Sequence, residues 1–278
     1  LIGPIVTSTP EAAAIYAPNG RLLREEDVMR NPAYAHFLDE IAAGLSALPA
    51  EGPLHSADLA AYTVYEREPL TVDLPGGTLF TNPPPSLGGS IIAHALADLP
   101  EQPTALDLLE ALRDATDHNK TLAPTSVRGT THISVTDGLQ TVAMTVSNGS
   151  CSGVMLGDTG VQLNNMMGES DLHPDGHVAQ VGSRIRSMMA PSLVVRDGVV
   201  TALGTGGSER IRSALTRTIG GLLRGVPLQD AIDAPRIHLD NARVVQIEPG
   251  FPPAELAALP EPVSHWRHKD FYFGGVHA

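Results

Sequence analysis

The sequence predicts a layered α+β protein with an antiparallel sheet at its centre. Helical patterns dominate the first part of the chain, two strand hairpins follow, and helices return after them. Elements in this order typically pack as helices against a sheet. With 278 residues, the chain is long enough to form one large domain or two small ones.

In the first half, apolar residues at three- and four-residue spacing predict a helix over 32–48, with Asn31 as its N-cap. A short helix is expected to start at Ser56. A strand segment is expected over 70–80, with a turn at Gly76-Gly77. The stiff stretch Asn-Pro-Pro-Pro-Ser-Leu-Gly-Gly-Ser (82–90) leads into a helix over 91–99, and a further helix is expected over 104–116.

The second half carries hairpin signals. Strands 131–136 and 141–147 are predicted to pair across the Asp137-Gly138 turn. Before them, the polar and unpatterned stretch 117–129 is expected to be an exposed loop. The remaining expected elements are strands 192–195 and 199–203, helices 209–223 and 228–234, strand 243–247 and helix 253–259.

Composition excludes several classes of protein. The formal net charge of −13 opposes binding to nucleic acids or to anionic membranes. No apolar run approaches the roughly 18 residues that span a bilayer, and residues 1–5 lack the basic region of a signal peptide. The single cysteine, Cys151, rules out a disulfide within the chain and is interpreted as a packing residue rather than a nucleophile.

A first candidate site is the stretch Arg-Gly-Thr-Thr-His (128–132), where the exposed loop meets the first hairpin. A cut after Gly129 would free the α-amine of Thr130, which titrates near neutrality and lies within reach of its own hydroxyl. Glycine before the cut permits the strained backbone that such an attack needs. From spacing alone, ordinary β-propensity explains the two threonines better. His132 shares a face with Thr130 and could serve chemistry or the core.

Two further candidates lie downstream. The stretch Gly-Thr-Gly-Gly-Ser (204–208) between a strand and a helix suits an oxyanion or a phosphate, or simply close strand–helix packing. It lacks the third glycine of a dinucleotide fingerprint and the lysine of a P-loop. The stretch Asp-Leu-His-Pro-Asp-Gly-His (171–177) could ligate a metal, but such loops are mostly solvated turns. We therefore predict no metal site and no cofactor.

Six motifs occur in an order that is specific when they are taken together, and the chain carrying them resembles the γ-glutamyltranspeptidase family of N-terminal-nucleophile hydrolases, in particular its divergent bacterial members. The motifs are Asn-Pro-Pro-Pro-Ser-Leu-Gly-Gly (82–89), Gly-Thr-Thr-His-Ile-Ser-Val (129–135), Gly-Asp-Thr-Gly-Val-Gln-Leu-Asn-Asn (157–165), Met-Ala-Pro-Ser-Leu-Val-Val (189–195), Gly-Gly-Ser-Glu-Arg-Ile (206–211) and Asp-Ala-Pro-Arg-Ile-His (233–238).

The resemblance implies a four-layer αββα sandwich made from a precursor that cuts itself between Gly129 and Thr130. Residues 1–129 would then be the C-terminal part of the large subunit and 130–278 the small, catalytic subunit, associated in one composite domain. The chain would be truncated at both ends relative to the family, and its compartment cannot be derived. The implied roles are Thr130 as nucleophile, Gly206 and Gly207 as the oxyanion hole, and Thr145, or Ser147 after a one-residue gap, as the supporting hydroxyl.

The substrate positions depart from the family pattern. Asn148 takes the place of a substrate-binding asparagine. Where the family has a glutamine and an acid, this chain has Met166 and Glu169. The serine pair that holds a carboxylate in the family is here Ser187 and Met188, and methionine cannot donate to a carboxylate. These changes predict a γ-glutamyl-type donor other than ordinary glutathione, with water or an amine as acceptor.

Three hypotheses follow. The leading one is a self-cleaving threonine amidohydrolase or acyltransferase, favoured by Thr130, Gly206 and Gly207. The second is a non-catalytic relative that serves as a binding or assembly module, favoured by the two methionines and the shortened chain. The third is a metal-dependent hydrolase that uses His173 and His177.

Overall fold

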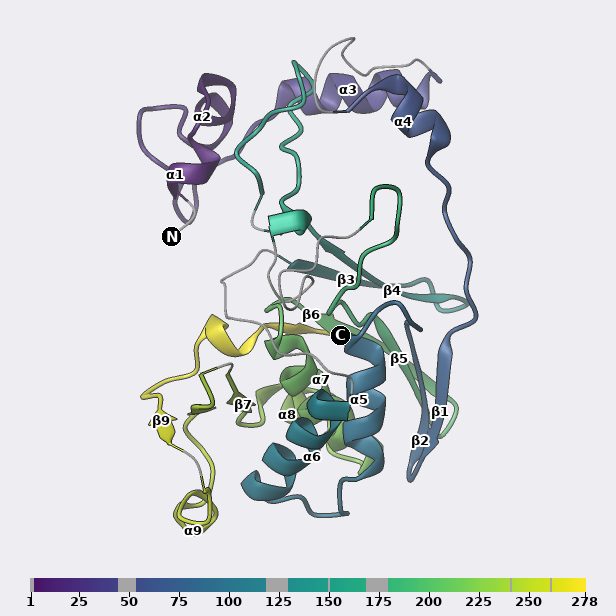
Figure 1. Ribbon diagram of the computed structural model, residues 1–278, viewed down its shortest axis with the longest axis vertical. Coiled ribbons are helices and arrows are strands. Elements are labelled where there is room, and N and C mark those ends of the chain that lie inside the picture. The colour runs from purple at the N-terminus through teal and green to yellow at the C-terminus, as the bar shows by residue number, and fades with distance from the viewer. Residues whose placement is uncertain are drawn as a thin grey trace. The chain divides into compact units, whose positions relative to one another are not determined.

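The computed structural model describes residues 3–44, 54–118, 130–149, 151–168, 180–240, 242–260 and 262–278, and the chain divides into two compact units (Figure 1). The first unit comprises Leu1–Glu66 and Asn148–Met166, and the second comprises Arg67–Ser147 and Met167–Ala278. Each unit therefore draws residues from both sides of the predicted cut, so a cut there would nick both units rather than separate them.

The first unit consists of short helices and the segment 148–166. Thr9 and Asn31 cap α2 and α3 by accepting hydrogen bonds from the backbone N–H groups of Ala12 and Tyr34, as sequence analysis predicts for Asn31. The Asn31 amide also donates to the carbonyl of Gly160 at 2.8 Å, which holds the later segment to α3. The helices are α1 (Gly3–Val6), α2 (Pro10–Tyr16), α3 (Pro32–Ala42) and α4 (Ser56–Ala61).

The second unit is built on a five-stranded antiparallel sheet in the order β1-β2-β5-β6-β10. Its strands are β1 (Leu70–Leu74), β2 (Gly77–Thr81), β5 (Ser192–Arg196), β6 (Val199–Thr205) and β10 (Val276–His277). Both predicted strand pairs are present, and β2 pairs with β5 although more than a hundred residues separate them. The predicted central antiparallel sheet is confirmed.

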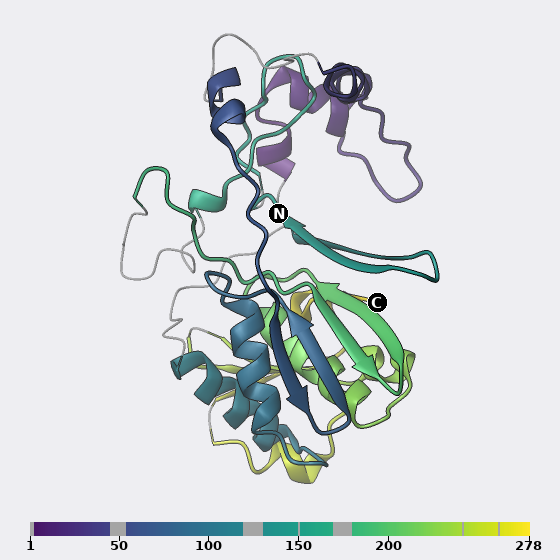
Figure 2. The same cartoon turned by 90° about the vertical axis from the view of Figure 1, so that its right-hand side faces the viewer.

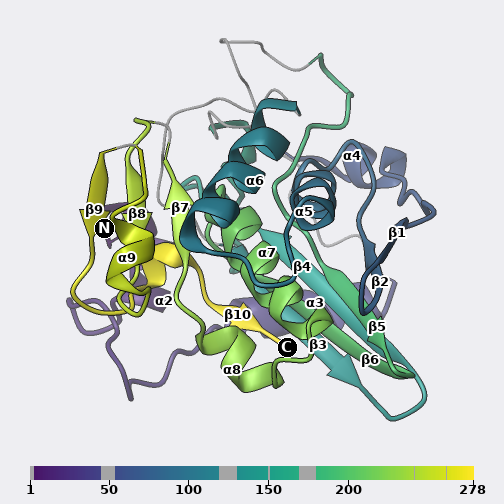
Figure 3. The same cartoon turned by 90° about the horizontal axis from the view of Figure 1, so that it is seen from below.

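Helices α5 (Gly88–Ala97), α6 (Ala105–His118) and α7 (Arg210–Leu223) form a layer on one side of this sheet (Figures 2 and 3). Helix α7 is buried along its whole length except at Arg217, so it is a core helix rather than an amphipathic surface helix. The main core fills the space between helices and sheet, and burial of each large aliphatic side chain there contributes about 1.5–3 kcal/mol. Its fully buried members include Leu79, Ile91, Ile92, Leu203, Ile211, Leu215 and Ile219.

The hairpin of β3 (Thr130–Thr136) and β4 (Thr141–Ser147) contacts β6 and lies on the other side of the sheet from α5 (Figure 2). Its burial alternates along both strands. The less exposed face is mostly polar and includes Thr130, His132 and Thr145, whereas the other face is exposed and mostly apolar. The exposed apolar side chains are Ile133, Val135, Val142, Met144 and Val146. Helices, sheet and hairpin supply three successive layers of the predicted αββα sandwich.

A smaller sheet and a second core complete the unit. The sheet has the order β7-β8-β9, and its core side chains pack against α6 and α9. The predicted strand 243–247 overlaps β8, whereas sequence analysis misses β7, β9 and β10, which are too short to show alternation. The elements are α8 (Leu228–Asp233), β7 (Ile237–Leu239), β8 (Val245–Ile247), α9 (Pro253–Leu256), β9 (Val263–His265) and the short helical turns Met166–Gly168 and Phe271–Phe273. No helix in the described ranges is long and apolar enough to cross a membrane.

His238 on β7 is fully buried, and its Nδ1 lies 2.7 Å from the hydroxyl of Ser213 on α7. Burial, with the nearby charges of Arg212 and Arg210, holds the pKa of His238 well below 6.5. Below about pH 6.5 the unfolded chain binds a proton at this position and the folded chain does not. The free energy of unfolding should therefore fall by about 1.4 kcal/mol per pH unit from this group.

Urea unfolding between pH 8 and pH 5.5 measures this dependence. His238→Gln should flatten the curve by about that slope, whatever it does to stability at pH 8. The exposed His36 on α3 offers a matched control, and His36→Gln should retain the wild-type slope. An unchanged slope in His238→Gln would show that His238 is not the titrating group.

Candidate functional site

Thr130 is the first residue of β3 and lies directly opposite Ser147, the last residue of β4. Its side chain is half-buried on the face toward β6, and its Oγ1 donates a hydrogen bond to Ser147 Oγ at 3.2 Å. The structure thus places the predicted nucleophile at a strand end, with a second hydroxyl beside it.

Gly206 lies against Thr130. A Cβ at Gly206 would stand 2.3 Å from the carbonyl oxygen of Thr130 and 3.5 Å from its Cβ. Two residues earlier, a Cβ at Gly204 would stand 2.1 Å from the ring of His132. Residues two apart share a face of a strand, so these two glycines leave that face without side chains and let β3 approach closely.

Gly207 and Ser208 carry the chain from β6 into α7. Both have positive φ values, +123° and +54°, and the carbonyls of both accept hydrogen bonds from the first residues of the helix. A serine in this conformation stores about 1 kcal/mol of strain, which is typical of functional loops. Gly206 and Gly207 precede the first turn of α7, and the N-terminal end of a helix dipole stabilises an anion.

The C-terminal segment supports this glycine loop from a second direction, a feature that sequence analysis misses. Gly274 has φ +81°, and a Cβ there would stand 2.7 Å from the carbonyl oxygen of Gly206. Arg236 donates to the carbonyl groups of Phe273, at 3.3 Å, and of Gly274. Arg236 belongs to the 233–238 motif, and that motif was the sequence signal from which its role could have been predicted.

Buried charges surround the same loop. Arg212 is buried and pairs with Glu209 at 3.7 Å, and Arg210 is buried and donates to the carbonyl of Tyr272. Burial lowers the pKa of both guanidinium groups. Two arginines beside one glutamate leave a surplus of positive charge at the start of α7, which favours a developing oxyanion.

His132 has a structural environment. It is 4% exposed, its Nδ1 lies 2.7 Å from Thr145 Oγ1, and its Nε2 lies 3.1 Å from Ser134 Oγ. Burial, and then the charge of His277, lower its pKa, so the ring is neutral at pH 7. Thr145 is therefore the hydrogen-bond partner of His132, whereas Ser147 is the partner of Thr130.

The two residues at the predicted carboxylate subsite differ in placement. Ser187 is half-buried, its Oγ accepts a hydrogen bond from the N–H of Met189 at 3.0 Å, and its carbonyl accepts one from Ser86. Met188 is 5% exposed and belongs to the main core. The Met188 side chain therefore packs in the core, whereas Ser187 is the more open of the two, and the substrate-binding role of both residues stays a prediction.

Asn148, Met166 and Cys151 belong to the first unit, where Cys151 is buried, in agreement with its interpretation as a packing residue. Several predicted positions lie outside the described residues. These are Gly129, most of the expected loop 117–129, Glu169, and His173 and His177 of the 171–177 stretch.

Comparisons with known proteins agree with the resemblance. The family model described as gamma-glutamyltranspeptidase matches residues 4–106 and 101–278. A glutathione hydrolase proenzyme of Escherichia coli is 27% identical over 75% of this chain and 48% of its own length. An acylase ACY 1 proenzyme of a Pseudomonas species is 26% identical over 90% of this chain and 57% of its own length.

A cephalosporin acylase from Bacillus halodurans shares the fold, with a TM-score of 0.75 at 22% identity over 95% of this chain and 61% of that chain. The fold class is thus confirmed as the N-terminal-nucleophile sandwich. The chain spans about half the length of the curated relatives it matches.

Replacing Gly206 should cost stability because the clash is with backbone. We expect Gly206→Ala to lower the free energy of unfolding by about 1–3 kcal/mol, since the Thr130 carbonyl cannot rotate away. At Gly275 a Cβ would make only ordinary contact, 3.7 Å from the Phe271 ring. Gly275→Ala should therefore change stability by less than about 0.5 kcal/mol. Equal urea midpoints for the two variants would contradict the close approach at Gly206.

Proposed function

This chain belongs to the γ-glutamyltranspeptidase family, and we propose that it is a threonine amidohydrolase or acyltransferase that cuts itself before Thr130 and acts on γ-glutamyl-type amides. The observations that carry the proposal are the hydrogen bond from the Thr130 hydroxyl to Ser147 and the close approach of Gly206 to the Thr130 backbone at the start of β3. A nucleophile next to N–H groups at a helix start is the arrangement that acyl transfer requires.

Self-cleavage would begin with attack of Thr130 Oγ1 on the carbonyl carbon of Gly129. The C–O bond forms, the C–N bond to Thr130 breaks, and the Oγ1 proton passes to the departing nitrogen. Water then hydrolyses the resulting ester, which leaves a carboxylate on Gly129 and a free α-amine on Thr130.

Turnover would use the same hydroxyl. The new α-amine, whose pKa lies near 8 in peptides, takes the Oγ1 proton as the oxygen attacks the donor amide. The N–H groups of Gly206 and Gly207 would bind the oxyanion, and the leaving amine would take the proton. Water or an amine acceptor then releases the acyl group from Thr130. No separate histidine is needed as the base, in agreement with the buried and neutral state of His132.

Ser147, rather than Thr145, is proposed as the hydroxyl that supports the nucleophile. The 3.2 Å contact with Thr130 Oγ1 supports Ser147, and the 2.7 Å contact with His132 assigns Thr145 to the core. This choice selects the second of the two alignments that the sequence leaves open.

The donor is proposed to carry a carboxylate held by Ser187 as the only hydroxyl of the family's serine pair. Ser187 Oγ already accepts a hydrogen bond from Met189, so its own proton is free to be donated to a substrate oxygen. Asn148 and Glu169 are kept as proposed contacts from the resemblance. Loss of the second hydroxyl, with Met188 in the core, supports a donor other than glutathione, and the relatives include acylases.

Denaturing intact mass tests the first step. The purified protein should give two fragments, 1–129 and 130–278, and Thr130→Ala should give one uncut chain with no turnover. Thr130→Ser keeps a hydroxyl and should still be cut. Thr131→Ala is the matched control, because its side chain points to the opposite, exposed face of β3 and its loss should change neither cutting nor turnover.

An uncut wild-type chain would overturn the enzyme proposal and favour the binding or assembly module. If the chain is cut, a donor panel of glutathione, a γ-glutamyl anilide and an acyl amide without an α-amino group follows. Fast turnover of glutathione would contradict the altered donor while leaving the nucleophile in place.

The two hydroxyls on β4 should separate in a kinetic assay. Ser147→Ala removes one hydrogen bond to the nucleophile and should lower the rate of cutting and kcat by about tenfold, equivalent to about 1.4 kcal/mol. Thr145→Ala should instead lower the free energy of unfolding by about 1–3 kcal/mol, because the ring of His132 loses a buried partner, with rates within about threefold of wild type. The reverse pattern would restore Thr145 to the catalytic role.

A further inference from the structure

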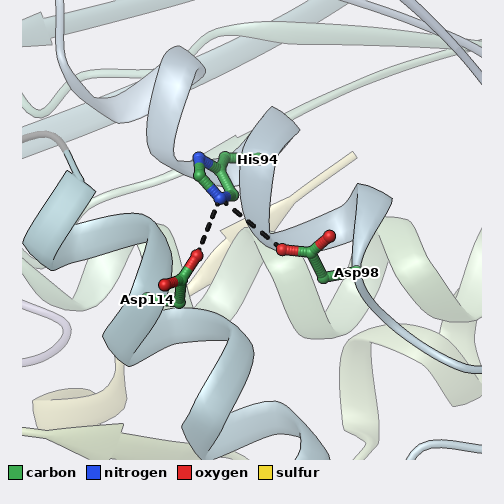
Figure 4. A group of neighbouring side chains, drawn as sticks. All are labelled: His94, Asp98 and Asp114. Atoms are coloured by element: carbon green, nitrogen blue, oxygen red, sulfur yellow. Dashed lines mark hydrogen bonds and ion pairs between the residues drawn. The ribbon is translucent and has the colours of Figure 1, made fainter.

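Two packed helices bring histidine and aspartate side chains together at a place remote in sequence from Thr130. His94 lies on α5, and Asp98, four residues later, is the C-cap residue of that helix. On α6, Asp114 and His118 are also four residues apart. Residues at this spacing share one face of a helix. Figure 4 shows the His94 ring between the carboxylates of Asp98 and Asp114.

The distances fit a small cation. His94 Nε2 lies 2.9 Å from Asp114 Oδ2 and 3.5 Å from Asp98 Oδ2, and the three ligand atoms lie within 4.8 Å of one another. Ligands about 2.1 Å from a tetrahedral ion stand about 3.4 Å apart. The two carboxylates would thus approach each other by about 1.4 Å at most, and His94 and Asp114 would move apart by about 0.5 Å, which side-chain torsions can supply.

A second imidazole lies at the same place. The ring of His118 meets the ring of His94 edge-on, with centroids 4.8 Å apart. His118 is exposed, so it can turn toward a fourth coordination position. Imidazole together with carboxylate suits Zn²⁺ and its first-row neighbours, whereas Ca²⁺ and Mg²⁺ prefer oxygen ligands alone.

The helices supply a fixed frame. Apolar neighbours of these residues, Ile91 and Ala95 on α5 and Ala111 and Ala115 on α6, are buried in the main core. The side chain of His94 is 27% exposed, whereas those of Asp98 and Asp114 are 55% and 69% exposed, so an ion could enter from solvent. Two carboxylates beside one imidazole also leave negative charge that a divalent cation would neutralise.

We propose that His94, Asp98 and Asp114, with His118 as a fourth ligand, bind one divalent first-row transition ion that clasps α5 to α6. The ion would be structural, and the proposal does not depend on the proposed function. The same segment of chain connects the clasp to the site, because the backbone at Gly88, the first residue of α5, contacts the carbonyl of Met188 beside Ser187.

Zinc titration of the EDTA-treated full chain at pH 7.5, followed by calorimetry and by thermal unfolding, tests the clasp. Wild type should bind one equivalent of Zn²⁺ and gain thermal stability, and an excess of Mg²⁺ or Ca²⁺ should not compete. His94→Gln and Asp114→Asn should each weaken binding at least about tenfold and lose the gain.

His36 and Glu40 on α3 provide the matched control, since they form a histidine–carboxylate pair at the same spacing with 3.6 Å between Nε2 and Oε1. His36→Gln should bind zinc like wild type. Circular dichroism checks that each variant folds. If one does not, Asp98→Asn, at an exposed helix end, takes its place. Stoichiometric binding that survives His94→Gln, that is lost instead in His173→Gln or His177→Gln, or that never occurs in wild type would overturn the proposal.

Discussion

The structure around the candidate site depends on one close approach, that of strand β3 to strand β6. Gly204 and Gly206 point toward His132 and Thr130, and neither glycine position has room for a Cβ. Because both pairs repeat with the period of a strand, the two backbones meet along a line and not at a single point. The backbone of Thr130 is thereby held against Gly206, at the start of the loop that leads into α7. A side chain at either position would push β3 away from β6.

Polar contacts fix this approach from both sides. Behind β6, Gly274 and the Arg236 guanidinium hold the carbonyl side of the glycine loop. Within the hairpin, His132 bonds to Thr145 and Ser134, and Ser134 donates onward to the carbonyl of Ala202 on β6. Such networks cost stability when one member is lost and position a strand more sharply than apolar packing does. The proposed nucleophile is therefore positioned by residues that take no part in the proposed chemistry.

Local patterns predicted much of this arrangement. The Asp137-Gly138 turn gives the hairpin, and pairing Thr136 with Thr141 across it already places Thr130 opposite Ser147. Counting that register would have placed Ser147, and not Thr145, opposite Thr130 without a structure. The packing of β3 on β6 could not be read in this way, because it joins segments about seventy residues apart and depends on glycines that look like a loop. The burial of Met188 is likewise a long-range result, set by α5 and the sheet.

The polarity of the β3–β4 hairpin is the reverse of what a surface hairpin shows, and this reversal connects fold to function. The hydroxyls and His132 face the sheet, whereas side chains such as Ile133 and Met144 face outward and are exposed. A four-layer sandwich covers that outer face with helices, and burial of each such side chain would contribute about 1.5–3 kcal/mol. The strand that carries Thr130 is then held by glycine contact on one face and by apolar packing on the other. Packing of helices against the outer face of the hairpin would therefore also help to hold the proposed nucleophile in position.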